Sequence, residues 1–377
     1  MFRAPPLPRT LEAALRDVVA TKPAVRADAL RDLARYAGPD AGDEAEARRA
    51  EILRAFEAAL RDAAPAVRAA AALGLADARA TEALPALLVA VEDESDHVRQ
   101  MAITALGELG DARATERLRR ALSDPRPEVR FQAAIAFPRV CASRGDAVEA
   151  LVRATEDSDP MVCQVALRMA EEMGIEGDDG SDPEAPVVDR RVLARARELV
   201  EHASPLVRTA AAIILARDGD ELGRGTLVAV ASGELATSDG EDEAAAIELC
   251  GELGVRAAIR GLEKRAFGGV LNLRPDRFAW HARVALARMG HERARREIMR
   301  DLDSWDRGRR ILAVAAVGRA RMSEARQELM RLRESNRVDA QPVDDALALI
   351  DRCDDSSRSV DAGAGHRAAR GGEGEAS

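Results

Sequence analysis

The residues of this chain best suited to recognition chemistry are aromatic and arginine side chains gathered between residues 267 and 305. This stretch holds both tryptophans and two of the six phenylalanines. Protein–protein interfaces are enriched in tryptophan and arginine, because a large ring and a planar guanidinium make extensive contacts. The alternative is that the rings fill gaps in an irregular part of the core. We predict a partner-binding site formed by Phe267, Arg274, Arg277, Phe278, Trp280, Arg283 and Trp305.

Charged residues recur with a fixed spacing in the first half of the chain. Each of three aspartates is followed six residues later by the arginine of a Val-Arg pair, and successive arginines are 31 residues apart. The pairs are Asp62 with Arg68, Asp93 with Arg99, and Asp124 with Arg130. A fixed period of this length is typical of a solenoid, in which each repeat is one supersecondary unit. Such a fold displays one long surface and usually acts by binding.

Residues suited to catalysis or metal binding form no recognisable motif. Of the five histidines only His291 is followed by a glutamate, and we expect it to be exposed after a helix stop at Gly290. The sequence contains no phosphate-binding loop and no nucleophile elbow. The cysteines form no CxxC pair and are expected to be reduced, buried small residues: Cys141, Cys163, Cys250 and Cys353. We predict no catalytic residue, cofactor or metal site.

The composition favours an all-helical, water-soluble chain. Hydrophobic residues make up 47% of the sequence but aromatics only 2%, so alanine, leucine and valine must form the core. Alanine has the highest helix propensity, and small side chains let helices approach closely. A net charge of −10 disfavours binding to nucleic acid or to an anionic membrane surface. No apolar run approaches the roughly 20 residues that a membrane-spanning helix needs.

Each repeat is expected to consist of two antiparallel helices. Between Asp111 and Gly145, Leu118 and Leu122 share one face of a first helix, which ends at Ser123-Asp124-Pro125. Gly110 is expected to end the preceding helix with a positive φ. A second helix begins near Glu128, and we expect it to bury four residues: Val129, Ala133, Ala136 and Phe137.

The repeat pattern extends over most of the chain and predicts about nine helix pairs. We divide the chain into an N-terminal extension (1–10), a repeat solenoid (11–353) and a disordered tail (354–377). Three insertions interrupt the solenoid. Those at 176–186 and 232–243 are acidic and are predicted to be solvated loops, whereas that at 267–279 mixes aromatic residues with turn formers.

The stretch LGDARATERLRRALSDPRPEVRFQAAIAF, from Leu109 to Phe137, resembles a HEAT repeat of the short variety called PBS-lyase HEAT-like. The resemblance covers about residues 11–353 and is strongest over 62–216. It implies a right-handed α-solenoid whose second helices line the concave side. It also implies a ladder of Asp–Arg pairs between neighbouring repeats, formed by Asp62, Arg68, Asp93, Arg99, Asp124, Arg130 and Arg208. Cys163 takes the arginine position of its repeat, so we expect Asp157 to lack a partner and the stack to be weaker there.

The sequence favours a non-enzymatic, cytoplasmic scaffold or adaptor that binds another protein on its solenoid surface. One alternative is a HEAT-like enzyme or enzyme subunit, similar to a bilin lyase or to the di-iron deoxyhypusine hydroxylases. Those hydroxylases use several His-Glu pairs, and the single pair here cannot supply them. A nucleic-acid-binding repeat protein is a further, less favoured alternative. The fold alone does not decide between these functions.

Overall fold

The computed structural model describes residues 8–38, 41–176, 187–268, 276–335 and 337–351. Most of the predicted acidic loop at 176–186, Arg274 and the predicted tail at 354–377 lie outside these residues. The chain divides into two compact units, Met1–Ile214 and Leu215–Ser377, whereas the sequence predicted one solenoid over residues 11–353 with three insertions. We call them the N-terminal and the C-terminal unit and describe each by itself.

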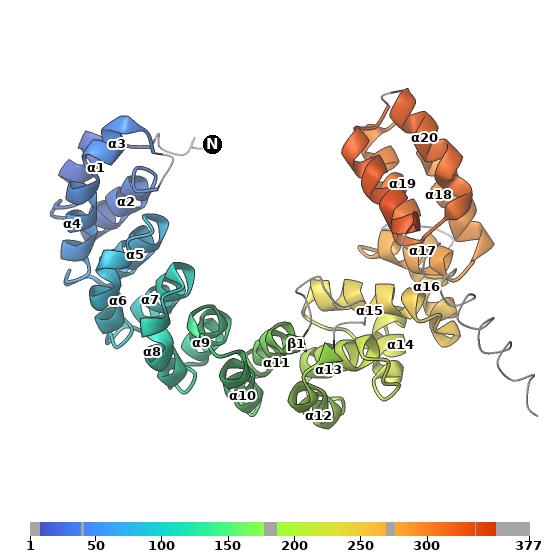
Figure 1. Cartoon of the computed structure of the whole chain (residues 1–377), viewed down its shortest axis with the longest axis horizontal. Helices are drawn as coiled ribbons and strands as arrows, with labels where there is room; N and C mark the ends of the chain where they lie inside the picture. Colours follow the sequence, from blue (N-terminus) through green and yellow to red (C-terminus); the bar gives the residue numbers. More distant parts are fainter. Residues whose placement is uncertain (1–7, 39–40, 177–186, 269–275, 336, 352–377) are drawn as a thin grey trace, which may run out of the picture. The chain divides into compact units, whose positions relative to one another are not determined.

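The N-terminal unit is a succession of helix pairs (Figure 1). The first helix of each pair is called helix A and the second helix B. The A helices lie in one layer and the B helices in another. The A helices are α1 (Leu11–Asp17), α4 (Arg49–Ala59), α6 (Leu84–Ala90), α8 (Thr115–Ala121), α10 (Arg144–Ala154) and α12 (Arg190–Leu199). The B helices are α2 (Pro23–Ala34), α5 (Pro65–Asp77), α7 (Asp96–Leu109), α9 (Pro127–Val140), α11 (Pro160–Gly174) and α13 (Pro205–Arg217), which ends in the C-terminal unit.

Two minor elements complete this unit. A short helix, α3 (Asp43–Ala47), precedes α4. The strands β1 (Ile175–Glu176) and β2 (Val187–Val188) form a two-residue antiparallel pair and are the only strands among the described residues. The predicted all-α fold is therefore confirmed.

Local sequence signals explain where the helices begin and end. Proline occupies the first position of α2, α5, α9, α11 and α13, where its missing N–H costs no hydrogen bond. Gly110 ends α7 with a φ of 66°, as predicted, in the left-handed conformation that glycine adopts without strain. The expected burial of Val129, Ala133, Ala136 and Phe137 on α9 is also confirmed.

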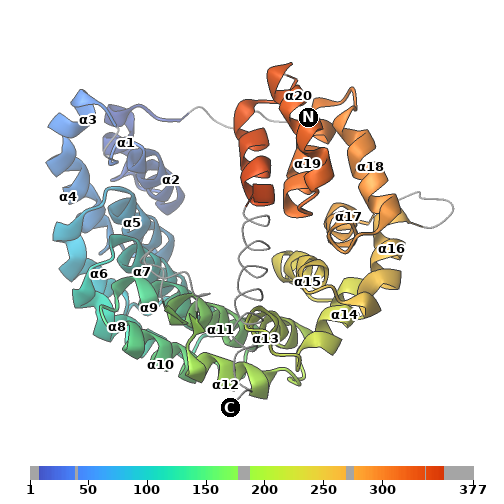
Figure 2. The same ribbon diagram turned by 45° about the vertical axis from the view of Figure 1, so that its right-hand side comes forward.

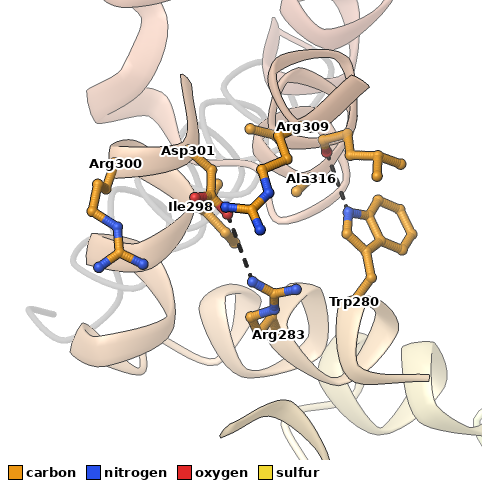
Figure 3. Close-up of a pocket in the computed structure, with 9 residues that line it drawn as sticks. Trp280, Arg283, Ile298, Arg300, Asp301, Arg309 and Ala316 are labelled. Atoms are coloured by element: carbon orange, nitrogen blue, oxygen red, sulfur yellow. Dashed lines mark hydrogen bonds and ion pairs between the residues drawn. The ribbon is translucent and has the colours of Figure 1, made fainter. Parts of the chain in front are cut away.

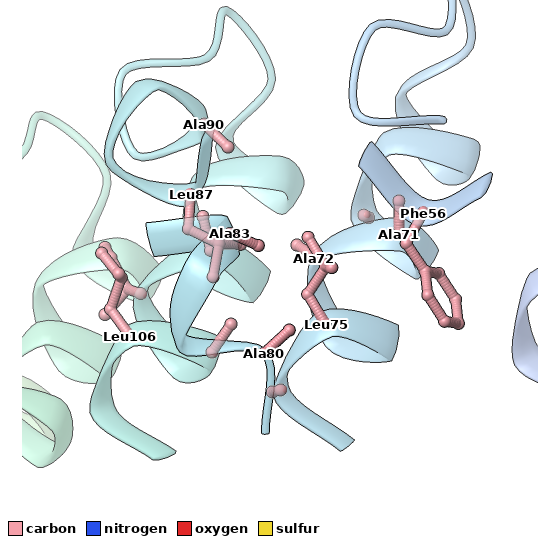
Figure 4. Close-up of a cluster of buried hydrophobic side chains, with 14 of the residues drawn as sticks. Phe56, Ala71, Ala72, Leu75, Ala80, Ala83, Leu87, Ala90 and Leu106 are labelled. Carbon is pink, nitrogen blue, oxygen red and sulfur yellow. The ribbon is translucent and has the colours of Figure 1, made fainter. Parts of the chain in front are cut away.

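Small residues let the B helices pack closely. The core between α5 and α7 consists mainly of alanines and leucines, with Phe56 of α4 packed on the other side of α5 (Figure 4). Gly107 of α7 lies against Ala136 of α9, and a Cβ at residue 107 would approach the Ala136 Cβ to 2.7 Å. This contact requires glycine, because real Cβ atoms do not come so close.

The C-terminal unit repeats the same arrangement (Figure 2). Its A helices are α14 (Arg224–Ser232), α16 (Ile259–Phe267), α18 (Glu292–Leu302) and α20 (Arg326–Glu334). Its B helices are α15 (Gly240–Glu252), α17 (Ala279–Arg288), α19 (Arg307–Arg319) and a last helix over residues 340–351. The described residues thus form ten helix pairs, one more than the nine or so predicted.

The predicted loop at 232–243 is wrong at its C-terminal end. Residues 240–243 form the first turn of α15, because the Asp239 carboxylate accepts hydrogen bonds from the backbone N–H groups of Glu241 and Asp242. Asp242 and Glu243 are buried rather than solvated. An acidic composition indicated a loop, but these residues are the N-terminal acidic turn that a helix dipole favours.

Candidate partner-binding site

A cavity of about 360 Å³ opens between α17, α18 and α19 in the C-terminal unit (Figure 3). Its walls combine one large aromatic ring, several aliphatic side chains and charged groups. The lining residues are Trp280 and Arg283 of α17, Ile298, Arg300 and Asp301 of α18, and Arg309, Leu312, Ala313 and Ala316 of α19. A concave, mostly apolar site with a few polar groups is the usual form of a binding pocket.

Arg283 departs from the repeat pattern at this cavity. Six of the described B helices are followed, within two residues, by a residue with positive φ. In five of the six, the residue seven positions before that one is apolar and fully buried. Those five residues are Ala72, Ile103, Ala212, Ile247 and Val314. In α17 the left-handed residue is Gly290, and the equivalent position is Arg283, whose side chain is 28% exposed. A charged group therefore stands where the other repeats place core side chains.

The Arg283 guanidinium is only loosely satisfied by the protein. Its Nε donates to the Ala279 carbonyl oxygen at 3.4 Å, and its Nη1 lies 3.6 Å from the Asp301 carboxylate. A guanidinium has five N–H donors, and burial makes unused donors costly. Arg283 can therefore donate hydrogen bonds to a further carboxylate or carbonyl group in the cavity.

Trp280 forms a wall of the cavity and is held in place on several sides. Its indole Nε1–H donates to the Leu312 carbonyl oxygen at 3.2 Å. The His281 ring meets it edge to face at 4.9 Å, and the Arg319 guanidinium lies over it at 5.3 Å. Glu248 of α15 contacts both of these residues, at 2.8 Å from His281 Nδ1 and 2.6 Å from Arg319 Nη1. The tryptophan is thus fixed before any partner arrives.

The His281 ring and the Arg319 guanidinium also affect the acidity of Glu248. Burial raises the pKa of this carboxyl, but the His281 and Arg319 contacts lower it more, so its pKa lies below the ordinary value. Glu248 therefore stays ionised at neutral pH and acts as a positioning residue for the Trp280 ring.

Phe278 does not belong to an exposed site, contrary to the prediction. It is 6% exposed and packs between two guanidinium groups, with Arg265 at 5.2 Å and Arg277 at 4.4 Å from its ring centre. Both arginines also bind Glu243, which is buried. Here the core reading of the aromatic cluster holds, because Phe278 fills the space beside a buried ion pair.

Phe267 lies in a separate cluster with His291. The two rings stack at 5.8 Å, and the Arg293 guanidinium covers Phe267 at 4.0 Å. His291 is not the exposed residue that was predicted: Nδ1 accepts the Ala294 N–H, so Nε2 carries the proton and donates to Glu263 at 2.9 Å. Neither Phe267 nor His291 lines the cavity.

Trp305 is the most exposed large hydrophobic residue among those described, at 99%. It lies in the turn between α18 and α19, two residues before α19 begins. The structure therefore divides the predicted site. Trp280 and Arg283 line the cavity, Trp305 and the side chain of Arg277 are exposed, and Phe267 and Phe278 are packed against neighbours.

Sequence reasoning missed several cavity residues: Ile298, Arg300, Asp301, Arg309 and Leu312. Arginine and leucine are too frequent on these helices to single out one position. The usable signal was the break of the repeat pattern at Arg283, seven residues before Gly290.

The Asp–Arg ladder is present in the N-terminal unit and links successive repeats. Each arginine donates from Nε and Nη2 to the aspartate of the following repeat, as in Arg68 with Asp93 at 2.8 and 2.7 Å. Its Nη1 donates to the carbonyl of the aspartate in its own repeat. The same pairing with the next repeat joins Arg26 to Asp62, Arg99 to Asp124 and Arg130 to Asp157. Arg26 differs in its own repeat, where Nη1 donates to the Ala20 and Thr21 carbonyls because no aspartate stands at residue 20. These pairs act in stacking and lie outside the cavity.

Two ladder expectations are wrong. Asp157 has a partner, because each aspartate is bound by the arginine of the preceding repeat and Arg130 supplies it. Arg208 donates to the His202 and Ala203 carbonyls of its own turn, but it forms no ion pair within the described part of the chain. Cys163 and His202 stand at the two positions of the missing next rung.

The described cysteines and acidic residues show no sign of a reactive or metal centre. Burial raises the pKa of the Cys163 thiol to about 11 and that of Cys250 to about 12, which keeps both protonated. Within the described ranges no three His, Cys, Asp or Glu side chains are grouped so as to hold a metal ion. No described helix is both long and apolar enough to cross a membrane.

Comparison with known proteins agrees with the geometry of stacked helix pairs. Residues 53–138 match the family model of HEAT repeats, so this part of the chain consists of HEAT repeats. No curated protein matches the sequence.

The chain is similar to several solved structures. Escherichia coli YibA is 17% identical with a TM-score of 0.50, over 74% of this chain and 92% of that one. At this identity the likeness concerns the fold alone. An engineered protein is 17% identical with a TM-score of 0.38 (90% and 98% covered). The complex of CpcE and CpcF of phycocyanin lyase from Nostoc sp. PCC7120 is 19% identical with a TM-score of 0.33 (78% and 96% covered).

Proposed function

We propose that the chain is a non-enzymatic protein–protein interaction scaffold, and that a partner protein inserts a side chain into the cavity between α17 and α19. The observation that carries this proposal is Arg283. A half-buried arginine stands at a B-helix position where other repeats place a core side chain. The cavity with the Trp280 wall lies beside this arginine. A scaffold needing only stability would place an aliphatic residue there, as Ile103 and Ile247 show.

The physical character of the cavity supports a protein partner. Trp280 offers a large, immobilised ring, so little conformational entropy is lost when a partner packs on it. Arg283 offers directional donors within a partly dry site, where hydrogen bonds are stronger. Interface hot spots combine these two residue types in desolvated pockets.

Trp305 supports a contact area wider than the cavity. A single exposed hydrophobic residue is ordinary, but a fully exposed tryptophan leaves one of the largest apolar side chains in water. A partner that covers Trp305 would bury that ring and gain the corresponding hydrophobic free energy. We propose Trp305 as the second anchor of the interface.

We infer that the protein works in the cytoplasm. The support is that Cys141, Cys163 and Cys250 are free, and that the last two are buried small residues in helices rather than disulfide partners. Proteins of reducing compartments use cysteine in this way.

Site-specific photocross-linking tests the proposed function. A photoreactive amino acid replaces Leu312, which lines the cavity and is 52% exposed. The matched control carries it at Leu222, which is 56% exposed in the same unit but does not line the cavity. In lysate of the source organism we expect one protein adduct from residue 312, absent at residue 222 and lost when Arg283→Ile is added. Equal adducts at both positions, or none, would reject this site.

A further inference from the structure

We propose that the partner segment bound in this cavity is acidic and carries an apolar side chain flanked by carboxylates. This inference rests on the proposed function and names the chemistry of the partner. It follows from the charge of the region, from the arginines that face the cavity and from the apolar walls between them.

The lining of the cavity carries an excess of positive charge. Arg283, Arg300 and Arg309 line it, and Asp301 is its one carboxylate. Other arginines of these helices do not add to the excess, because they pair with carboxylates of neighbouring elements, as Arg307 does with Asp339. A concave site with cationic groups and low-dielectric walls concentrates the field and attracts anionic segments. The excess of arginine in the lining therefore selects for negative charge in the partner.

Two arginines beside the cavity have no carboxylate partner among the described residues. Arg300 and Arg309 line the cavity, and neither forms an ion pair with a described residue. By contrast, Arg307 binds Asp339 at 2.9 Å. The single lining carboxylate, Asp301, faces Arg283 at 3.6 Å. Figure 3 shows the ion pair between Arg283 and Asp301, with the Arg309 side chain above Arg283. The cavity lining thus holds three arginines and one carboxylate, which leaves guanidinium donors for carboxylates of a partner.

The walls between these charges require an apolar group. Trp280, Ile298, Leu312 and Ala316 present carbon surface to the cavity. A partner with carboxylates alone would leave this surface wet, whereas a leucine, methionine or phenylalanine would bury it. Carboxylates on either side of that residue would then reach the arginines, and bidentate pairing would fix the orientation.

Nucleic acid is the competing polyanion, and the observations favour a peptide. A nucleic-acid site must neutralise a continuous row of phosphates. Here the three arginines line a single cavity, and the chain has a net charge of −10. The cavity also accepts one side chain rather than a backbone track, because its volume is about 360 Å³. Peptide and oligonucleotide are therefore separated experimentally.

The test is a selection from a random peptide display library on the full-length protein. Enriched sequences are synthesised, labelled and titrated by fluorescence anisotropy. We expect an enriched motif with an apolar residue between aspartates or glutamates, and binding that weakens with salt. We expect Arg300→Glu/Arg309→Glu to raise the Kd about tenfold or more. Arg256→Glu/Arg260→Glu carries the same charge change on exposed positions outside the cavity lining and should leave the Kd within about twofold.

Three outcomes would overturn the proposed chemistry: no enriched acidic motif, equal weakening by both double variants, or displacement of the peptide by an oligonucleotide of equal charge but not by a second acidic peptide. Circular dichroism of each variant separates loss of folding from loss of binding. If an adduct still forms at residue 312 while acidic peptides do not bind, the scaffold function stands and the acidic partner is wrong. If neither is seen, both fail.

Discussion

At the residue scale, one substitution within a repeat pattern creates the candidate site. A buried aliphatic residue fills the space between B helices at Ile103 and Ile247, and Arg283 takes that position in α17. Its charged end turns to Asp301, and a cavity remains beside Trp280. The sequence gives up some core packing at this point, as functional sites commonly do.

Arg283→Ile is expected to restore the repeat pattern and remove the site. Because replacing a partly buried charge by a well-packed hydrophobe is often neutral or stabilising, the free energy of unfolding should stay within about 1 kcal/mol or rise. Peptide binding should be lost in the same variant. Urea unfolding and anisotropy measure the two effects.

The converse change is the control. Ile247→Arg places a guanidinium at a fully buried position, and we expect a loss of about 3 kcal/mol or more. If Arg283→Ile destabilises the protein as strongly as Ile247→Arg does, then Arg283 is a structural residue and its proposed role in binding is wrong.

At the element scale, the B helices are joined by a ladder whose rungs cross from one repeat to the next. The rung between Arg99 and Asp124 is bidentate, at 2.9 and 3.0 Å, with side chains 14% and 12% exposed. At this burial the pair lies between an exposed ion pair, which contributes little, and a fully buried one.

A double-mutant cycle on Arg99 and Asp124 separates the energy of their pairing from the cost of leaving one charge buried and unpaired. Arg99→Met should cost about 2 kcal/mol, because it leaves the Asp124 carboxylate without its guanidinium. Arg99→Met/Asp124→Leu should recover most of that loss, since no charge remains unpaired. Urea denaturation of the four proteins gives the coupling energy. Additive losses would show that the two residues do not act as a pair.

Arg310 stands at the ladder position of α19 and lacks its rung. Its Nη1 donates to the Ser304 and Trp305 carbonyls as in the ladder, but its Nε is buried and has no partner within the described residues. Ladder aspartates lie three residues before the next B helix, and that position before residues 340–351 is Arg337. Arg337→Asp should complete the rung and stabilise the protein by about 1 kcal/mol.

Arg337→Ala separates the new rung from simple removal of a like charge. We expect thermal unfolding to rise for Arg337→Asp and to change by less than half as much for Arg337→Ala. Equal midpoints for the two variants would mean that Arg310 gains no carboxylate partner from the substitution.

At the scale of the whole molecule, the sequence predicted the helix pairs, the glycine stops and the fold, because a period repeated along a chain averages out local errors. It predicted the site only in part. The prediction that Phe278 belongs to the binding site was wrong because its burial depends on contacts between distant residues. Glu243 occupies a ladder position and binds Arg265 and Arg277, which pack on the Phe278 ring. These contacts join Glu243 of α15 to Arg265 of α16, 22 residues away, and to Arg277 before α17, 34 residues away, so no local sequence pattern predicts them.

The ladder also makes the stability of the whole N-terminal unit depend on pH. The hydrogen bond from Arg26 lowers the pKa of Asp62 below its ordinary range, despite burial. Burial alone would raise the pKa of Asp93 and of Asp157. The guanidinium and backbone N–H groups that donate to these carboxylates lower it by more, so both pKa values lie below the ordinary value. A carboxyl with a lowered pKa in the folded state stabilises that state above its unfolded pKa, near about 4. The stabilisation is lost as the pH falls through the lower, folded pKa.

Asp93→Asn measures this contribution, because asparagine keeps the shape of a protonated aspartate and cannot ionise. We expect wild type to unfold at a higher temperature than Asp93→Asn at pH 7. The gap should hold down to about pH 4 and narrow as the pH falls further, through the lowered pKa of Asp93 in the folded state. Glu94→Gln is the matched control, since Glu94 is largely exposed and its 3.3 Å contact with Arg68 is secondary. A gap for Asp93→Asn that stays constant across this range would mean that the ladder stabilises the stack by shape and not by charge.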